Sequence, residues 1–261
     1  MRIAVSADST CDLSRELLEM YDIGITPLYI IMGETSLLDG AECSPRDIFA
    51  YVDRTGSLCS TAAVSIEDYR NWFAARLSRQ DQVVHFTISS SMSSCYQNAC
   101  AAAADFPGRV FVVDSRSLST GIGHLAIDAA LLARQGKDGG EIQAILEEKR
   151  EKLNVSFVLE TLHYIYKGGR CSGVAALGAN LLGLKPCIEV RNGAMGVGKK
   201  YRGHLEKVLP EYVEERLLGH DRDSIDYRRI FITDSGADAA LVARLETLIR
   251  EKTPFREIHH T

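Results

Sequence analysis

Residues 83–104 read VVHFTISSSMSSCYQNACAAAA. The apolar run Val83–Ile88 is typical of a buried strand, and the alanine-rich segment from about Ser93 to Ala104 is typical of a helix. Five serines lie between and at the start of these two segments: Ser89, Ser90, Ser91, Ser93 and Ser94. Because the first N–H groups of a helix lack intrahelical partners and carry partial positive charge, this junction can hold an anion. A serine-rich capping loop explains the same pattern, and the residue types alone do not decide between them.

Strand and helix patterns alternate on both sides of this segment. Ile3–Ala7 and Val110–Val113 are predicted strands, and Leu118–Gln135 is a long predicted helix. Ser44-Pro45 and Ser65 have the signatures of helix N-termini. This alternation predicts a parallel α/β layer.

The second half of the chain has a different pattern. Strand patterns flank Asn192-Gly193, a strong signal for a two-residue hairpin turn. A hairpin among helices predicts a mixed sheet. We therefore expect an α/β fold with two domains, a parallel N-terminal domain over residues 1–153 and a mixed-sheet C-terminal domain over residues 154–261.

Composition and charge narrow the classes of function. The chain has 261 residues, of which 46% are hydrophobic and 25% charged, as in ordinary globular proteins. The 35 acidic and 30 basic residues give a net charge of -5, which does not favour nonspecific binding to nucleic acid or to an anionic membrane. The sequence has no run of about 18 apolar residues, so no membrane span is predicted. The N-terminus lacks a signal-peptide pattern. A cytoplasmic location is therefore expected. The seven scattered cysteines are expected to be reduced thiols without a metal.

Three predicted strands end in an Asp-Ser pair, at Asp8, Asp114 and Asp234. Ligands bind at the carboxyl ends of strands in open α/β sheets, and aspartates there can hold a metal ion or accept a phosphoryl group. Caps and braces for the following loops explain the same pairs, and we favour that interpretation because the spacing does not bring the three together. A metal-dependent phosphotransferase or phosphatase is therefore a second hypothesis.

Two further segments could lie near a ligand. Cys59–Ser65 is a second hydroxyl-bearing segment before a helix, and its small residues either leave room for a ligand or form a plain loop with a cap at Ser65. Gly121 and Gly123 weaken a predicted helix, which indicates close packing against a neighbour or a ligand. No phosphate-binding glycine loop, HExxH or GxSxG motif is present. The residues alone predict an α/β protein with a hydroxyl-lined anion site.

Several motifs, taken in chain order, match one family pattern. Ser6–Leu13 resembles an opening Asp-Ser-Thr segment, and Ile88–Gln97 resembles Ile-Ser-Ser-Gly-Leu-Ser-Gly-Thr-Tyr-Gln. Lys167–Arg170 and Leu184–Pro186 match a block of the second domain. Thr61–Ser65 stands where the pattern has Thr-Ser-Gln-Pro-Ser. The small residues that replace part of this pattern are expected to alter the entrance of a ligand cavity. Across the whole chain the protein resembles the DegV family, bacterial fatty-acid-binding proteins that serve fatty acid kinase.

The resemblance implies a lipid-binding protein without catalysis of its own and without a cofactor other than its ligand. Thr61 and Ser93 would hold the carboxylate of a long-chain fatty acid through their hydroxyls. Ala62, Ser94 and Gly121 would be neighbours of the head group or of the tunnel. A carrier of another amphiphilic carboxylate would need the same head-group chemistry and is a third hypothesis.

The acyl chain would lie in a closed tunnel between the domains. Burial stabilises an alkyl chain by about 0.8 kcal/mol per CH₂, so a C16 tail contributes roughly 12 kcal/mol before the costs of binding. Three small-residue segments could leave room for it: Ala99–Ala104, Gly121–Ala130 and Val174–Leu182. Tight helix packing explains the alanine run equally well.

The resemblance also implies a partner. A separate fatty acid kinase would phosphorylate the presented carboxylate, and Arg170, Lys199 and Arg202 would form its docking face, with Lys200 as the alternative to Lys199. We expect a monomer that contacts no nucleic acid and touches a membrane surface only transiently. The family's C-terminal His-x-Gly-Pro-Gly segment, whose histidine also contacts the carboxylate, has no counterpart in Glu257–Thr261. The C-terminal domain is therefore expected to be shortened, and neither His259 nor His260 is assigned that role.

Overall fold

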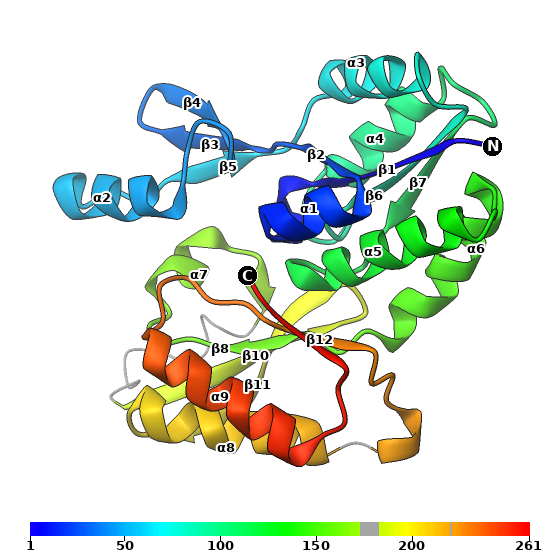
Figure 1. The fold of residues 1–261 in the computed structure, drawn as a ribbon. Helices are drawn as coiled ribbons and strands as arrows, with labels where there is room; N and C mark the ends of the chain where they lie inside the picture. The colour runs from blue at the N-terminus through cyan, green and yellow to red at the C-terminus, as the bar shows by residue number, and fades with distance from the viewer. Residues whose placement is uncertain (173–182, 220) are drawn as a thin grey trace. The chain divides into compact units, whose positions relative to one another are not determined.

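The computed structural model describes residues 1–172, 183–219 and 221–261 (Figure 1). The chain forms two compact units. The first comprises Met1–Val155 and Val190–Ala194, and the second comprises Ser156–Glu189 and Met195–Thr261. The boundary expected after residue 153 lies close to this division, but the segment Val190–Ala194, expected in the second domain, belongs to the first unit. The helix expected at residues 174–182 lies outside the described residues.

The first unit is built on a four-stranded sheet in the order β2-β1-β6-β7. All three strand pairs are parallel, which confirms the expected parallel layer. Its strands are β1 (Ile3–Asp8), β2 (Ile23–Thr26), β6 (Gln82–Thr87) and β7 (Val110–Asp114). The helices α3 and α4 cover one face, and α5 and α6 cover the other (Figure 1). The helices around this sheet are α1 (Arg15–Tyr21), α3 (Ile66–Leu77), α4 (Cys95–Ala103), α5 (Thr120–Arg134) and α6 (Gly139–Lys149).

A smaller antiparallel sheet in the first unit has the order β4-β3-β5. Its strands are β3 (Tyr29–Met32), β4 (Thr35–Leu38) and β5 (Ser60–Ala62), and α2 (Pro45–Thr55) lies between β4 and β5 in the chain. No strand was predicted at β5. Its three residues lack apolar alternation, and they are extended because they pair with β3, about thirty positions earlier in the chain.

Side-chain caps begin the helices at the expected serines. The Ser65 hydroxyl accepts a hydrogen bond from the backbone N–H of Asp68 at the start of α3. Ser44 and Asp47 form a reciprocal capping box at α2, with Pro45 in the first turn. Between α3, α4 and the sheet lies a core that includes Tyr69, Phe73, Cys95 and Ala99, all fully buried. This core holds α4 against the sheet.

The second unit contains a mixed sheet in the order β8-β10-β11-β9, as expected. β8 is antiparallel to β10, whereas β9 is parallel to β11. The turn between β10 and β11, at Asn192 and Gly193, belongs to the first unit and has φ angles of 51° and 81°, the left-handed pair that such a hairpin requires. The strands are β8 (Ser156–Val158), β9 (Cys171–Ser172), β10 (Leu184–Arg191) and β11 (Ala194–Arg202), and the helices are α7 (His163–Gly168), α8 (Leu205–Leu218) and α9 (Ala239–Lys252).

A separate parallel pair, β12 (Arg229–Ile232) and β13 (Glu257–His260), completes the second unit. The sequence predicted β12 but not β13. The helices α8 and α9 pack against each other (Figure 1). Among the described residues, no helix has both the length and the apolar character that a bilayer span needs.

Candidate functional site

The serines between β6 and α4 have different partners. The Ser89 hydroxyl donates to the carbonyl of Gly193 at 2.6 Å, and the Ser90 hydroxyl donates to the Asp114 carboxylate at 2.6 Å. The backbone N–H of Ser89 also donates to the Ser117 carbonyl. These two side chains therefore brace the loop, and they are committed to protein acceptors.

Ser93 and Ser94 lie at the start of α4. The Ser93 hydroxyl donates to the Cys95 sulfur at 3.2 Å and accepts from the backbone N–H of Cys95 at 3.3 Å. Ser94 is exposed and makes no side-chain capping bond. Because sulfur is a weak acceptor, the Ser93 hydroxyl can turn to a carboxylate at little cost. The structure thus leaves a weakly held hydroxyl at a helix N-terminus, where a negative charge is favoured.

The Thr61 segment is held against the same helix. Thr61 pairs with Ile30 in the small sheet, and its side chain is exposed. Three residues later, the Val64 carbonyl accepts a hydrogen bond from the Asn98 side chain of α4 at 2.8 Å. The Ser93 segment therefore precedes α4, and the Thr61 segment is tied to α4 through Val64. A shared grip of Thr61 and Ser93 on one carboxylate stays a prediction.

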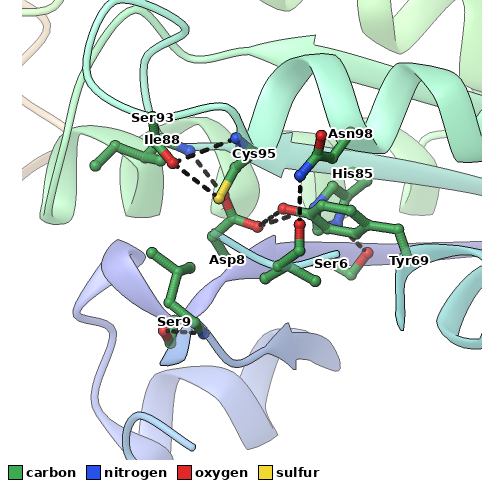
Figure 2. A network of polar contacts seen from close by, with 11 residues as sticks. Ser6, Asp8, Ser9, Tyr69, His85, Ile88, Ser93, Cys95 and Asn98 are labelled. Carbon is green, nitrogen blue, oxygen red and sulfur yellow. Dashed lines mark hydrogen bonds and ion pairs between the residues drawn. The ribbon is translucent and has the colours of Figure 1, made fainter. Parts of the chain in front are cut away.

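A fully buried polar network surrounds Asp8 at the end of β1 (Figure 2). One carboxylate oxygen accepts from the Tyr69 hydroxyl at 2.6 Å and lies 3.3 Å from His85 Nε2. The other oxygen accepts from the backbone N–H of Ile88 at 3.0 Å. His85 Nδ1 lies 2.9 Å from the Ser6 hydroxyl. Asp8 therefore connects β1, α3 and β6 to the first residue of the serine loop.

Burial fixes the protonation of two groups beside Asp8. Desolvation, and then the Asp8 carboxylate, raise the pKa of Tyr69 well above its usual range. The same two causes, in the same order, raise the pKa of the Cys95 thiol. Both groups consequently carry their protons at neutral pH.

Sequence reasoning missed this network, for which the only signal was the Asp-Ser pair at the end of the first strand.

The other strand-end aspartates are occupied by protein donors. Asp114 accepts from the backbone N–H groups of Ser90 at 3.1 Å and Arg116 at 2.9 Å. Asp234 accepts from the backbone N–H groups of Gly236 and Ala237, both at 2.8 Å. In residues 1–172, 183–219 and 221–261, no three His, Cys, Asp or Glu side chains gather as a metal site requires. The backbone contacts of Asp114 and Asp234 brace the loops after their strands, which is the interpretation that we favoured from the sequence.

The small residues of α4 and α5 pack against their own unit. A Cβ added at Gly121 would lie 2.1 Å from the Ser117 hydroxyl, and one at Gly123 would lie 2.6 Å from the Leu13 side chain. Ala99 and Ala102 are fully buried in the core beside α3. Close packing thus explains these glycines and alanines. Of the three segments considered for the tunnel, residues 174–182 lie outside the described part of the chain.

A cavity of about 300 Å³ lies elsewhere in the first unit. Its walls include Arg116, Arg150, Glu151 and Asn192, and they include neither Thr61 nor Ser93. Arg116 pairs with Glu151 at 2.6 Å, and Arg150 donates to the Asp114 carbonyl at 2.7 Å. A wall of charged groups does not suit an acyl tail.

The basic residues expected to dock a partner differ in their surroundings. The Lys199 ammonium is held by Glu215 and lies 3.5 Å from Glu211, both on α8. Arg170 donates to the Gly168 carbonyl at 2.7 Å. Arg202 is exposed. The charge of Lys199 is therefore compensated within its own unit.

Comparison with known proteins places the chain in a family context. The family described as "Uncharacterised protein, DegV family" matches residues 2–261. A DegV domain-containing protein of Clostridium perfringens is 33% identical over 215 residues, which are 82% of this chain and 77% of that protein.

Two solved structures, whose names refer to fatty acid binding, have the same fold. A fatty-acid-binding DegV family protein of Thermus thermophilus superposes with a TM-score of 0.87 and 30% identity, covering 100% of this chain and 92% of that one. A stearic-acid-binding protein of Eubacterium ventriosum superposes with a TM-score of 0.81 and 25% identity, covering 97% and 89%. The expected α/β fold is confirmed by these superpositions.

Proposed function

Since the chain belongs to the DegV family, we propose that it binds a long-chain fatty acid and holds the carboxylate with the hydroxyls of Thr61 and Ser93. The observation that carries this proposal is the position of the two hydroxyl segments. One provides Ser93 at the N-terminus of α4, and the other is tied to α4 through Val64 and Asn98. The names of the similar proteins from Thermus and Eubacterium supply the ligand class.

Hydroxyl groups suit a carboxylate that must still react. A hydrogen bond from a neutral donor to a charged acceptor contributes about 1.5–3 kcal/mol, enough to orient the head group. An arginine fork would bind the same carboxylate more tightly and lower its nucleophilicity. The bound acid keeps one oxygen that can attack a phosphoryl group.

We further propose that the protein presents this oxygen to a fatty acid kinase. The carboxylate oxygen would attack the γ-phosphoryl group of ATP on the kinase, forming an acyl phosphate as the bond to ADP breaks. The protein would supply no catalytic group. Its docking face would include Arg170 and Arg202, together with Lys200, which shares a face of β11 with Arg202 because side chains alternate along a strand.

Extraction of the purified protein tests the lipid proposal. Mass spectrometry of an organic extract is expected to find one long-chain fatty acid per chain, and delipidated protein is expected to take up palmitate. Thr61→Val and Ser93→Ala should lower the recovered amount because each removes one donor to the carboxylate. Delipidated protein that takes up no palmitate or oleate would contradict the proposal. An extract dominated by another amphiphilic acid would instead identify a different carboxylate ligand.

A further inference from the structure

Ser93 and the buried carboxylate of Asp8 lie in the same region of polar contacts (Figure 2). Ser93 donates to Cys95, and the Tyr69 hydroxyl donates to Asp8. Tyr69 and Cys95 are both fully buried in the same core cluster. Tyr69 of α3 therefore fixes the Asp8 carboxylate of β1, and a residue of the same core holds the Ser93 hydroxyl.

The acceptors of these two hydroxyls differ in strength. The Tyr69 hydroxyl donates its one proton to the Asp8 carboxylate at 2.6 Å. The Ser93 hydroxyl donates to the Cys95 sulfur, which is a weak acceptor. The Ser93 hydroxyl is thus held in place, yet is free to donate to a stronger acceptor.

Asp8 also controls the backbone before Ser93. It accepts the N–H of Ile88, the first residue of the loop between β6 and α4. The carboxylate is fully buried, as are Tyr69 and His85, so water does not screen these contacts. Asp8 therefore acts on Ser93 through the loop, in which the Ser89 carbonyl accepts the backbone N–H of Ser93 at 3.2 Å.

We propose that Asp8 and Tyr69 are positioning residues of the fatty acid site, which direct the Ser93 hydroxyl toward the carboxylate of the ligand. This inference rests on the proposed function, because it assigns these residues to the same site. A purely structural role for the network would affect the stability of the first unit and leave the environment of the bound carboxylate unchanged.

The test uses Tyr69→Phe and Asp8→Asn in the full chain. Tyr69→Phe removes one hydroxyl and keeps the ring that stacks on Phe73. The dissociation constant for palmitate and the ¹³C shift of bound [1-¹³C]palmitate are measured together with the melting temperature. We expect each variant to weaken palmitate binding by about tenfold and to move the ¹³C resonance, because Ser93 no longer meets the carboxylate at its best angle.

Asp128→Asn is the matched control. Asp128 is a buried carboxylate on α5 of the same unit, and it pairs with Lys149. It is expected to lower the melting temperature without changing the palmitate affinity or the ¹³C shift.

The outcomes separate the two proposals. If the wild-type protein binds no palmitate, the proposed function fails, and this inference fails with it. If the wild type binds but Tyr69→Phe leaves both the affinity and the ¹³C shift unchanged, only the inference is overturned. Tyr69→Phe is sufficient to overturn it even where Asp8→Asn does not fold.

Discussion

Adjacent basic residues on β11 are not equivalent. Lys199 and Tyr201 both bond to Glu215 on α8, and the Lys199 ammonium also lies 4.7 Å from the centre of the Tyr201 ring. Lys200 and Arg202 occupy the alternate positions of the strand and are exposed. A partner that recognises positive charge would therefore meet Arg202 more readily than the compensated Lys199.

Replacing Arg202 tests the docking face. With a fatty acid kinase and ATP, Arg202→Ala is expected to raise the protein concentration that gives half-maximal acyl phosphate formation about tenfold, because an interface charge is lost. Its palmitate affinity should stay unchanged. Arg244→Ala is the control, since Arg244 is another exposed arginine of the second unit. Equal kinetics for the Arg202 and Arg244 variants would remove Arg202 from the docking face.

Individual site residues were predictable only where a local pattern marked them. The serine cluster before α4 indicated an anion site, but only the family resemblance selected Ser93 among five serines. The structure shows that two of the five, Ser89 and Ser90, brace the loop, and the role of Ser93 stays a prediction. The role of Asp8 could not be predicted, because its partners Tyr69 and His85 come from distant segments that meet only in the folded sheet.

At the scale of elements, the start of α3 is tied to the small sheet that carries Thr61. Asp68 accepts from Ser65 at 2.5 Å and from the Tyr29 hydroxyl of β3 at 2.8 Å. Hydrogen bonds lower the pKa of Asp68 below its usual value, and the bond from Ser65 contributes more than the bond from Tyr29. Because Tyr29 lies in β3, its bond to Asp68 also helps to fix β3, with which β5 pairs.

Asp68→Asn tests this link through its pH dependence. A lowered folded-state pKa stabilises the protein above the unfolded Asp value of about 3.9, and this contribution is lost as the pH falls through the folded-state pKa. Urea unfolding should show the variant about 1 kcal/mol less stable at neutral pH, with a difference that shrinks on acidification. Glu67→Gln, in the same helical turn, should change stability by less than about 0.5 kcal/mol. A difference for Asp68→Asn that is constant with pH would contradict the link.

Elements with strong local signals were predicted, and short paired strands were not. The parallel strands β1, β6 and β7 are apolar runs followed by polar turns, and the hairpin turn at Asn192-Gly193 has a specific chemistry. By contrast, β5 has three small or polar residues and is a strand only through its distant partner β3.

For the whole molecule, the order and the type of the elements were sufficient to predict an α/β fold with a mixed second sheet. The superpositions confirm the fold, and the strand order confirms the mixed sheet. The course of the acyl tail was not predictable in this way, because small residues indicate room for a ligand and tight packing equally well. In α4 and α5 they pack against neighbouring side chains. The head-group site can therefore be tested more sharply than the tunnel.

The most direct measurement compares palmitate with hexadecanol, which has the same chain length but no carboxylate, in the wild type and in the Thr61→Val/Ser93→Ala variant. Each lost hydrogen bond to a charged oxygen removes about 1.5–3 kcal/mol. We predict that the delipidated wild type binds palmitate at least about tenfold more tightly than the alcohol, and that this preference disappears in the double variant. A double variant that keeps the full preference for palmitate would contradict carboxylate binding by these two hydroxyls.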